Sequence, residues 1–123
     1  MADWAGFLAL ATRLVTEDGQ AQLRSAVSRA YYSAYNDARR YVRNKSPMFS
    51  GKDEQHWLVW DWFASEPGRA PQVATLGSAL RKTRNRADYN VYSEIPNLKY
   101  EANQAVQKAT KILSLLDELR ANA

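Results

Sequence analysis

The sequence predicts an all-α protein: a single domain over residues 1–123, folded as an up-and-down bundle of about five helices. Apolar residues recur three and four positions apart along most of the chain, as they do on the buried face of a helix. Proline and glycine fall between these periodic stretches and mark their ends. The hydrophobic content of 46% over 123 residues is enough to build one core.

The first two helices are predicted in the first third of the chain. One runs from Trp4 to Val15 and ends at Glu17-Asp18-Gly19. The other keeps its apolar spacing from Leu23 to Val42, which makes it the longest and most regular segment of the first half. Ser46-Pro47 ends it, and a loop is expected over residues 46–51.

An aromatic run from Trp57 to Phe63 predicts a short third helix that Pro67-Gly68 closes. A strand is the alternative, because aromatic residues also favour strands. The helix would be apolar nearly all round, so we expect it to bury a second face, for example in a homodimer or against a partner protein. Trp57, Trp60 and Trp62 are the expected anchors of that interface.

Two further helices complete the predicted bundle. Pro71 suits the first turn of the fourth helix, which is expected to end near Asn90. Pro96 opens the fifth helix, whose apolar face extends from Leu98 to Leu119. Short connections favour antiparallel packing of successive helices.

Composition excludes several classes of function. The chain has no cysteine, which rules out disulfides and thiolate chemistry, and its single histidine rules out a metal site with two histidines from one chain. It has no apolar run of the ~20 residues that a membrane span needs, and Met1-Ala2-Asp3-Trp4 lacks the basic start of a secretory signal. We therefore expect a cytoplasmic protein without a metal, a cofactor or a membrane contact.

Positive charge is concentrated in two of the predicted helices. Residues 20–45 and 71–90 are strongly basic, whereas residues 51–66 are acidic. The basic residues of the two helices are Arg24, Arg29, Arg39, Arg40, Arg43, Lys45, Arg81, Lys82, Arg84 and Arg86. This distribution favours an anionic partner at one part of the surface, although two solvated helix faces would give the same pattern.

A candidate binding stripe lies along one edge of the second helix. Arg24, Ser28, Tyr31 and Tyr35 are spaced so that they share one side of that helix. A guanidinium, hydroxyls and aromatic rings are the groups that a nucleotide-binding cleft between helices would use. The alternative is that these tyrosines simply pack at the edge of the core.

On the fourth helix Arg84 and Asp88 are one turn apart and can form an ion pair. That pair is predicted either as a structural clamp or as part of a site next to the stripe. His56, beside Trp57, is expected to pack or cap a helix rather than to catalyse. The sequence contains no glycine-rich phosphate loop, no Ser-His-Asp set and no carboxylate cluster with metal-ligand spacing.

Two sequence blocks resemble the HEPN superfamily of small helical proteins. They are Arg24-Ser-Ala-Val-Ser-Arg-Ala-Tyr-Tyr-Ser-Ala-Tyr35, followed by His56, and Leu80-Arg-Lys-Thr-Arg84-Asn-Arg-Ala-Asp-Tyr89-Asn90. The resemblance covers roughly residues 20–116. It implies a helical bundle, nucleotide or RNA binding, homodimers, and roles in toxin–antitoxin or anti-phage defence systems.

The resemblance also implies a catalytic motif that this chain keeps only in part. Ribonuclease members carry an arginine, usually with a polar residue after it, and then a histidine four to six residues further on. Arg84-Asn85 matches the first half, but the positions where the histidine would stand hold Tyr89, Asn90 and Val91. His56 is too distant in the chain to be expected as a simple substitute.

We therefore expect a binding module rather than an enzyme, with Arg24, Ser28, Tyr31, Tyr35, Arg84, Asn85 and Asp88 as the binding residues. Its ligand would be a nucleotide, an RNA or a protein. The first alternative is an endoribonuclease that uses Arg84 with Tyr89 or His56 as the proton carrier. The second is an interaction subunit for a cognate antitoxin or nucleotidyltransferase, bound through the tryptophans.

Overall fold

The computed structural model describes residues 4–46, 56–89 and 95–122, with the backbone alone for Trp4 and Ala5. Within these residues the chain forms five α-helices and no strand, so the all-α fold class is confirmed. The strand alternative for Trp57–Phe63 is wrong, because this run lies inside a helix. Most of the loop predicted over residues 46–51 lies outside the described residues.

The helix bounds agree with the sequence signals. The helices are α1 (Trp4–Leu14), α2 (Gln20–Lys45), α3 (His56–Ala64), α4 (Ala70–Tyr89) and α5 (Leu98–Ala121). Gly68, in the turn before α4, has a φ of 69°, which a glycine adopts without steric cost. Asn97, which precedes α5, has a φ of 59°, a left-handed conformation that asparagine tolerates better than most residues.

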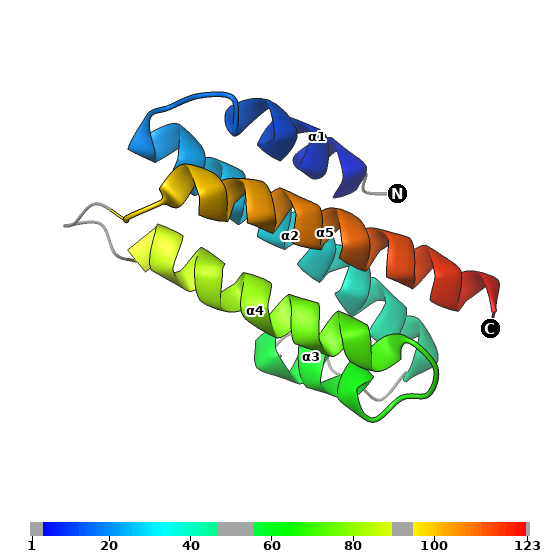
Figure 1. The fold of residues 1–123 in the computed structure, drawn as a ribbon. Coiled ribbons are helices and arrows are strands. Elements are labelled where there is room, and N and C mark those ends of the chain that lie inside the picture. Colours follow the sequence, from blue (N-terminus) through cyan, green and yellow to red (C-terminus); the bar gives the residue numbers. More distant parts are fainter. Residues whose placement is uncertain (1–3, 47–55, 90–94, 123) are drawn as a thin grey trace.

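Four of the helices alternate in direction, as an up-and-down bundle requires. α1 and α2 run in opposite directions, as do α2 and α4, and α4 and α5 (Figure 1). The short α3 departs from this order because it runs in the same direction as α2. Its first residue, His56, contacts Tyr31, and its Phe63 contacts Tyr41 further along α2. α2 lies at the centre and packs against each of the other four helices.

Small residues let the helices approach one another closely. Ala26, Ala30, Ala34 and Ala38 of α2 are fully buried, so the central helix presents little side-chain bulk to its neighbours. On α4, Gly77 faces the fully buried ring of Trp60 on α3, and a Cβ at position 77 would overlap that ring. The close approach of α3 to α4 therefore depends on a glycine at this position.

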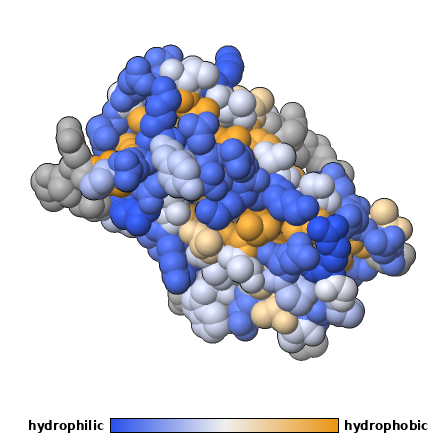
Figure 2. All heavy atoms as spheres, viewed as in Figure 1, coloured by the Kyte–Doolittle hydropathy of each residue, from blue (hydrophilic) through white to orange (hydrophobic). Residues whose placement is uncertain are grey.

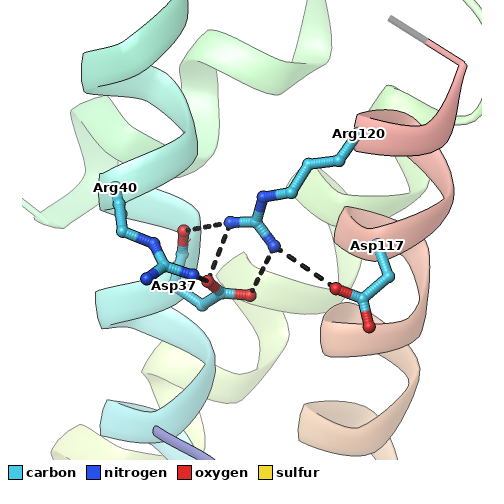
Figure 3. Close-up of polar contacts among 4 residues, drawn as sticks. All are labelled: Asp37, Arg40, Asp117 and Arg120. Atoms are coloured by element: carbon cyan, nitrogen blue, oxygen red, sulfur yellow. Dashed lines mark hydrogen bonds and ion pairs between the residues drawn. The ribbon is translucent and has the colours of Figure 1, made fainter. Parts of the chain in front are cut away.

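α2 and α5 are also joined by a buried ion pair. Arg120 of α5 donates hydrogen bonds to both carboxylate oxygens of Asp37 on α2, at 2.8 and 3.1 Å, and Arg40 donates to the same carboxylate at 3.0 Å (Figure 3). Asp37 is only 5% exposed. Asp117 adds a second, more exposed carboxylate on the far side of Arg120.

One face of the bundle is drawn with its hydropathy in Figure 2. Hydrophilic side chains cover most of the face shown in Figure 2, with hydrophobic ones in bands between them. Among the described residues, no helix combines the length and the apolar composition that crossing a bilayer requires.

Candidate functional site

A buried arginine lies between α2 and α4. Arg84 is only 6% exposed, and its guanidinium carbon lies 5.0 Å from the ring centre of Tyr31 and 5.3 Å from that of Tyr32. Both rings belong to α2. The side-by-side packing of α2 and α4 thus brings Arg84 against the tyrosines that the sequence places on the second helix.

The only histidine of the chain completes this cluster. His56 Nδ1 lies 2.8 Å from the Tyr31 hydroxyl and 3.3 Å from Arg84 Nη2. Its ring stacks on Tyr35, with 3.9 Å between ring centres. Nothing in the sequence indicated that His56 lies beside Arg84, because the two residues are 28 positions apart, but the packing of α3 against α4 makes them neighbours.

The hydrogen-bond partners fix where the protons lie. The Trp60 indole nitrogen donates to the Tyr31 hydroxyl at 3.2 Å, since an indole N–H can only donate. Arg84 is also an obligate donor, so His56 Nδ1 must accept. The Tyr31 hydroxyl therefore donates its own proton to Nδ1, and a neutral His56 carries its ring proton on Nε2.

The electrostatic environment keeps both groups uncharged. Burial lowers the pKa of His56 to about 4, and the positive charges of Arg84, Arg81 and Arg39 act in the same direction. Burial also raises the pKa of Tyr31 to about 12. At neutral pH the cluster therefore contains a charged arginine, a neutral imidazole and a protonated phenol.

Two residues at the end of α4 complete the surroundings of Arg84. Its Nη1 lies 3.4 Å from an Asp88 carboxylate oxygen and 3.3 Å from the Tyr89 hydroxyl. Burial would lower the pKa of Arg84, but contacts with Tyr32, Tyr89, Tyr31 and Asp88 raise it above its ordinary value. Within the described part of the chain, the buried Arg84 Nε has no hydrogen-bond partner.

A polar groove of about 500 Å³ opens beside this cluster. It lies between the first half of α2 and the end of α4, and Phe7 of α1 forms part of its wall. Its other lining residues are Arg24, Ser25, Ser28, Arg29, Tyr32, Asn36, Ala87 and Asp88. Tyr32 and Asp88 also contact Arg84, so the groove and the buried cluster are adjacent.

The predicted binding residues do not all lie in the groove. Arg24, Ser28 and Asp88 line it, and Arg24 also donates a hydrogen bond to the backbone carbonyl of Ala87 at 3.1 Å. Tyr31 and Tyr35 do not form its wall: they are 0% and 5% exposed, because the helical register turns them towards α3. The alternative, that these two tyrosines simply pack with the core, is confirmed.

Arg84 and Asn85 do not line the groove either. Arg84 lies behind the ring of Tyr32, and Asn85 is half-buried on α4. The three residues proposed for an active enzyme are nevertheless close together, because Arg84 contacts both His56 and Tyr89.

The predicted tryptophan interface is largely inside the protein. Trp60 is fully buried, and its ring contacts Tyr31 and Tyr35, so it is unable to anchor a partner. Trp62 is partly buried against Tyr41. Only Trp57, which is 49% exposed, remains a surface tryptophan on α3, because the bundle core covers more of this short helix than its composition predicted.

Sequence reasoning missed a second polar stripe on α2. Ser25, Arg29, Tyr32 and Asn36 follow one another at intervals of three and four residues, and all line the groove. The same helical spacing that identified the Arg24 stripe could have found this one. It also missed Arg81, whose charge acts on both His56 and Tyr31.

No family model, no curated protein and no solved structure matches this chain. The resemblance to the HEPN superfamily therefore rests on the sequence blocks alone. Among the described residues, no three histidine or acidic side chains are grouped as metal ligands would be.

Proposed function

We propose that the chain is a non-catalytic, HEPN-like binding module that holds the phosphates of a nucleotide or an RNA in the groove between α2 and α4. The observation that carries this proposal is the lining of the groove. Two arginines, two serines and an asparagine face one concave space, and these side chains supply the donors that phosphate oxygens accept.

Charge and aromaticity support the same ligand class. Among its described lining residues the groove has two arginines, Arg24 and Arg29, against one carboxylate, Asp88, which also contacts Arg84. Tyr32 adds an aromatic ring to the wall, and such rings stack on bases without sequence preference.

The histidine geometry argues for binding rather than cleavage. A general base must accept a proton, yet His56 Nδ1 is already occupied by Tyr31 and Arg84. A general acid must be protonated, yet the pKa of His56 is lowered to about 4. His56 is therefore poorly suited to either role at neutral pH.

The proposal is tested by measuring RNA and nucleotide affinity at several salt concentrations. Arg29→Gln should weaken binding several-fold and reduce the slope of log affinity against log salt by about one, as expected for one lost phosphate contact. Arg69→Gln is the matched control: this exposed arginine precedes α4 and pairs with Glu118, roughly 28 Å along the helix from Asp88. Equal affinities for the wild type and Arg29→Gln would count against the groove.

Arg84→Ala should also weaken binding, because it removes the charge behind Tyr32. Circular dichroism must first show that the variant still folds, since Arg84 is buried. The wild type should leave RNA intact in the same experiments, even at high protein concentration.

An endoribonuclease is the second candidate, and one observation favours it. Arg84, His56 and Tyr89 meet within hydrogen-bond distance, so an arginine and two proton carriers share one site. The assay is RNA cleavage by the purified chain. Products that disappear with both Arg84→Ala and His56→Gln would establish the enzyme and displace the binding module.

A further inference from the structure

The groove between α2 and α4 exists because two helices of the bundle do not meet. α2 and α5 both pack against α1 and against α4, but within the described residues α1 and α4 do not contact each other. α5 lies between them in the view of Figure 1. The groove is lined from α1, α2 and α4 and therefore opens away from α5. α2 forms its floor, Phe7 of α1 stands on one side, and Ala87 and Asp88 of α4 stand on the other.

Asp88 differs from the other polar groups that line this groove. Arginine side chains only donate hydrogen bonds, and serine, tyrosine and asparagine side chains donate or accept, whereas a carboxylate only accepts. Among the described lining residues, Asp88 is the one side chain of this last kind. Phosphate oxygens are negatively charged acceptors themselves and are unable to pair with it. A ligand that uses the whole groove therefore brings N–H or O–H donors as well as phosphate.

Arg84 holds Asp88 beside an aromatic ring. The Nη1 of Arg84 lies 3.4 Å from Asp88 Oδ2, and its guanidinium carbon lies 5.3 Å from the ring centre of Tyr32. Asp88 and Tyr32 both line the groove, whereas Arg84 is buried behind them. A carboxylate has several lone-pair directions, so the contact with Arg84 orients Asp88 and leaves it able to accept further hydrogen bonds. The groove thus presents an acceptor next to a ring on which a base can stack.

Among the common bases, guanine has the donors that such an acceptor fits. Its N1–H and its N2 amino group lie side by side on one edge, so a single carboxylate can accept from both. Adenine and cytosine place an acceptor nitrogen beside their amino group, and uracil has a carbonyl oxygen on each side of its N–H. Each of these bases would turn a lone pair towards Asp88, and an unpaired acceptor of this kind costs affinity.

We propose that the groove selects guanine, with Asp88 accepting from the N1–H and the N2 amino group of a base that stacks on Tyr32. Ser28 and Arg29 hold the phosphate of the same nucleotide. Ser28 precedes Tyr32 by one helical turn, about 6 Å along the axis, which one nucleotide spans from its phosphate to its base. The inference rests on the proposed function and narrows its ligand to guanine nucleotides and to RNA that exposes an unpaired guanine.

The first test measures the affinity of the wild type for guanosine, inosine and adenosine monophosphates (GMP, IMP and AMP). The three share the same ribose and phosphate and differ only in the base. GMP carries both donor groups, IMP keeps N1–H alone, and AMP has an amino group beside an acceptor nitrogen. GMP should bind about 10-fold or more tighter than AMP, with IMP between them. Equal affinities for GMP and AMP would overturn the selection of guanine.

The second test identifies the residue that reads the base. Asp88→Asn removes a negative charge and introduces an amide, so inorganic phosphate and AMP should bind more tightly. GMP should nevertheless bind about 5-fold or more weakly, because one of its two donor groups loses its acceptor. Asp117→Asn, the same change on an exposed residue near the end of α5, is the control and should alter none of these affinities. A preference for GMP that survives Asp88→Asn would overturn the inference.

The remaining outcomes separate this inference from the proposed function. If Arg29→Gln weakens GMP and AMP alike and Asp88→Asn tightens both, the groove stands as a phosphate site and the selection of guanine is overturned. If Asp88→Asn weakens GMP and AMP alike but leaves dideoxyguanosine monophosphate unaffected, Asp88 pairs with the ribose hydroxyls and the base is not read. If the wild type binds no nucleotide and no RNA, both proposals fail.

Discussion

Two buried charged residues contact the central helix α2 and have different partners: Asp37 belongs to α2 itself, and Arg84 of α4 packs against its tyrosines. Asp37 is surrounded by Arg40 and Arg120, at 3.0 and 2.8 Å, and both arginines lie on helices of the bundle. Arg84 is equally buried, but its nearest carboxylate among the described residues, Asp88, lies at 3.4 Å and is partly exposed. Its other hydrogen-bond partners, the Tyr89 hydroxyl and the neutral His56, carry no charge.

The difference separates a structural clamp from a candidate site. A buried charge is tolerated where it is fully paired and hydrogen-bonded, as Asp37 is. Arg84 keeps an unpaired Nε within the described residues, and it lies beside a groove that holds further positive charge. A buried charged group that the protein pairs only in part is typical of a functional site, where a ligand supplies the missing partner.

Of the substitutions that test this comparison, one at Asp37 should lower stability the most. Asp37→Ala should lower the free energy of unfolding by about 3 kcal/mol, because it leaves two arginines without their shared carboxylate. Urea unfolding at neutral pH measures the loss. Asp117→Ala, at the exposed end of the same network, should cost less than about 0.5 kcal/mol. If the two variants lost similar free energies of unfolding, Asp37 would contribute no more to stability than the exposed Asp117, and the buried pair would not be a structural clamp.

Gly77→Ala should have the next largest effect. The added methyl group would overlap the buried ring of Trp60 and force α3 away from α4, at a cost of about 2 kcal/mol. Because α3 carries His56, the same change should also alter the nitrogen signals of that histidine. Ser78→Ala, at the exposed neighbouring position, should change stability by less than about 0.5 kcal/mol and leave those signals as they are.

The pH dependence of stability should reveal the neutral histidine. With the folded-state pKa of His56 near 4 and an unfolded value of 6.5, the unfolded chain binds more protons between these values. Stability is therefore complete above pH 6.5 and declines as the pH falls towards 4. Between pH 7.5 and pH 5 the wild type should lose about 1 kcal/mol more than His56→Gln, a modest difference because the ring is partly exposed. Parallel curves for the two proteins would contradict a buried neutral His56.

A small effect on stability is expected at Asp88. Asp88→Asn removes a carboxylate that contacts Arg84, but this carboxylate is partly exposed, so the loss should stay below about 1 kcal/mol. Anion binding should instead become a few-fold tighter, since the positive charge beside the groove is less neutralised. A loss as large as that of Asp37→Ala would show that the two clusters are balanced in the same way.

Much of the fold followed from local patterns, whereas the site followed only in part. Helical spacing and the breaks at Pro67-Gly68 and Pro96 predicted the helices, because both signals act over a few residues. The same spacing put Arg24 and Ser28 on one face of the second helix, and the structure shows that both line the groove. It failed for Tyr31 and Tyr35, since periodicity tells which residues share a face but not which neighbouring helix covers it.

The sequence by itself determined five helices, their bounds, and the concentration of arginine on two of them. Only the tertiary structure decided that His56 meets Arg84 across 28 residues, that Trp60 is buried against Gly77, and that Asp37 pairs with Arg120 at the other end of the chain. The physical reason is the distance along the chain over which each kind of interaction acts. Helix formation and capping depend on neighbours within a turn or two, whereas a buried charge finds its partner only when separate helices pack together.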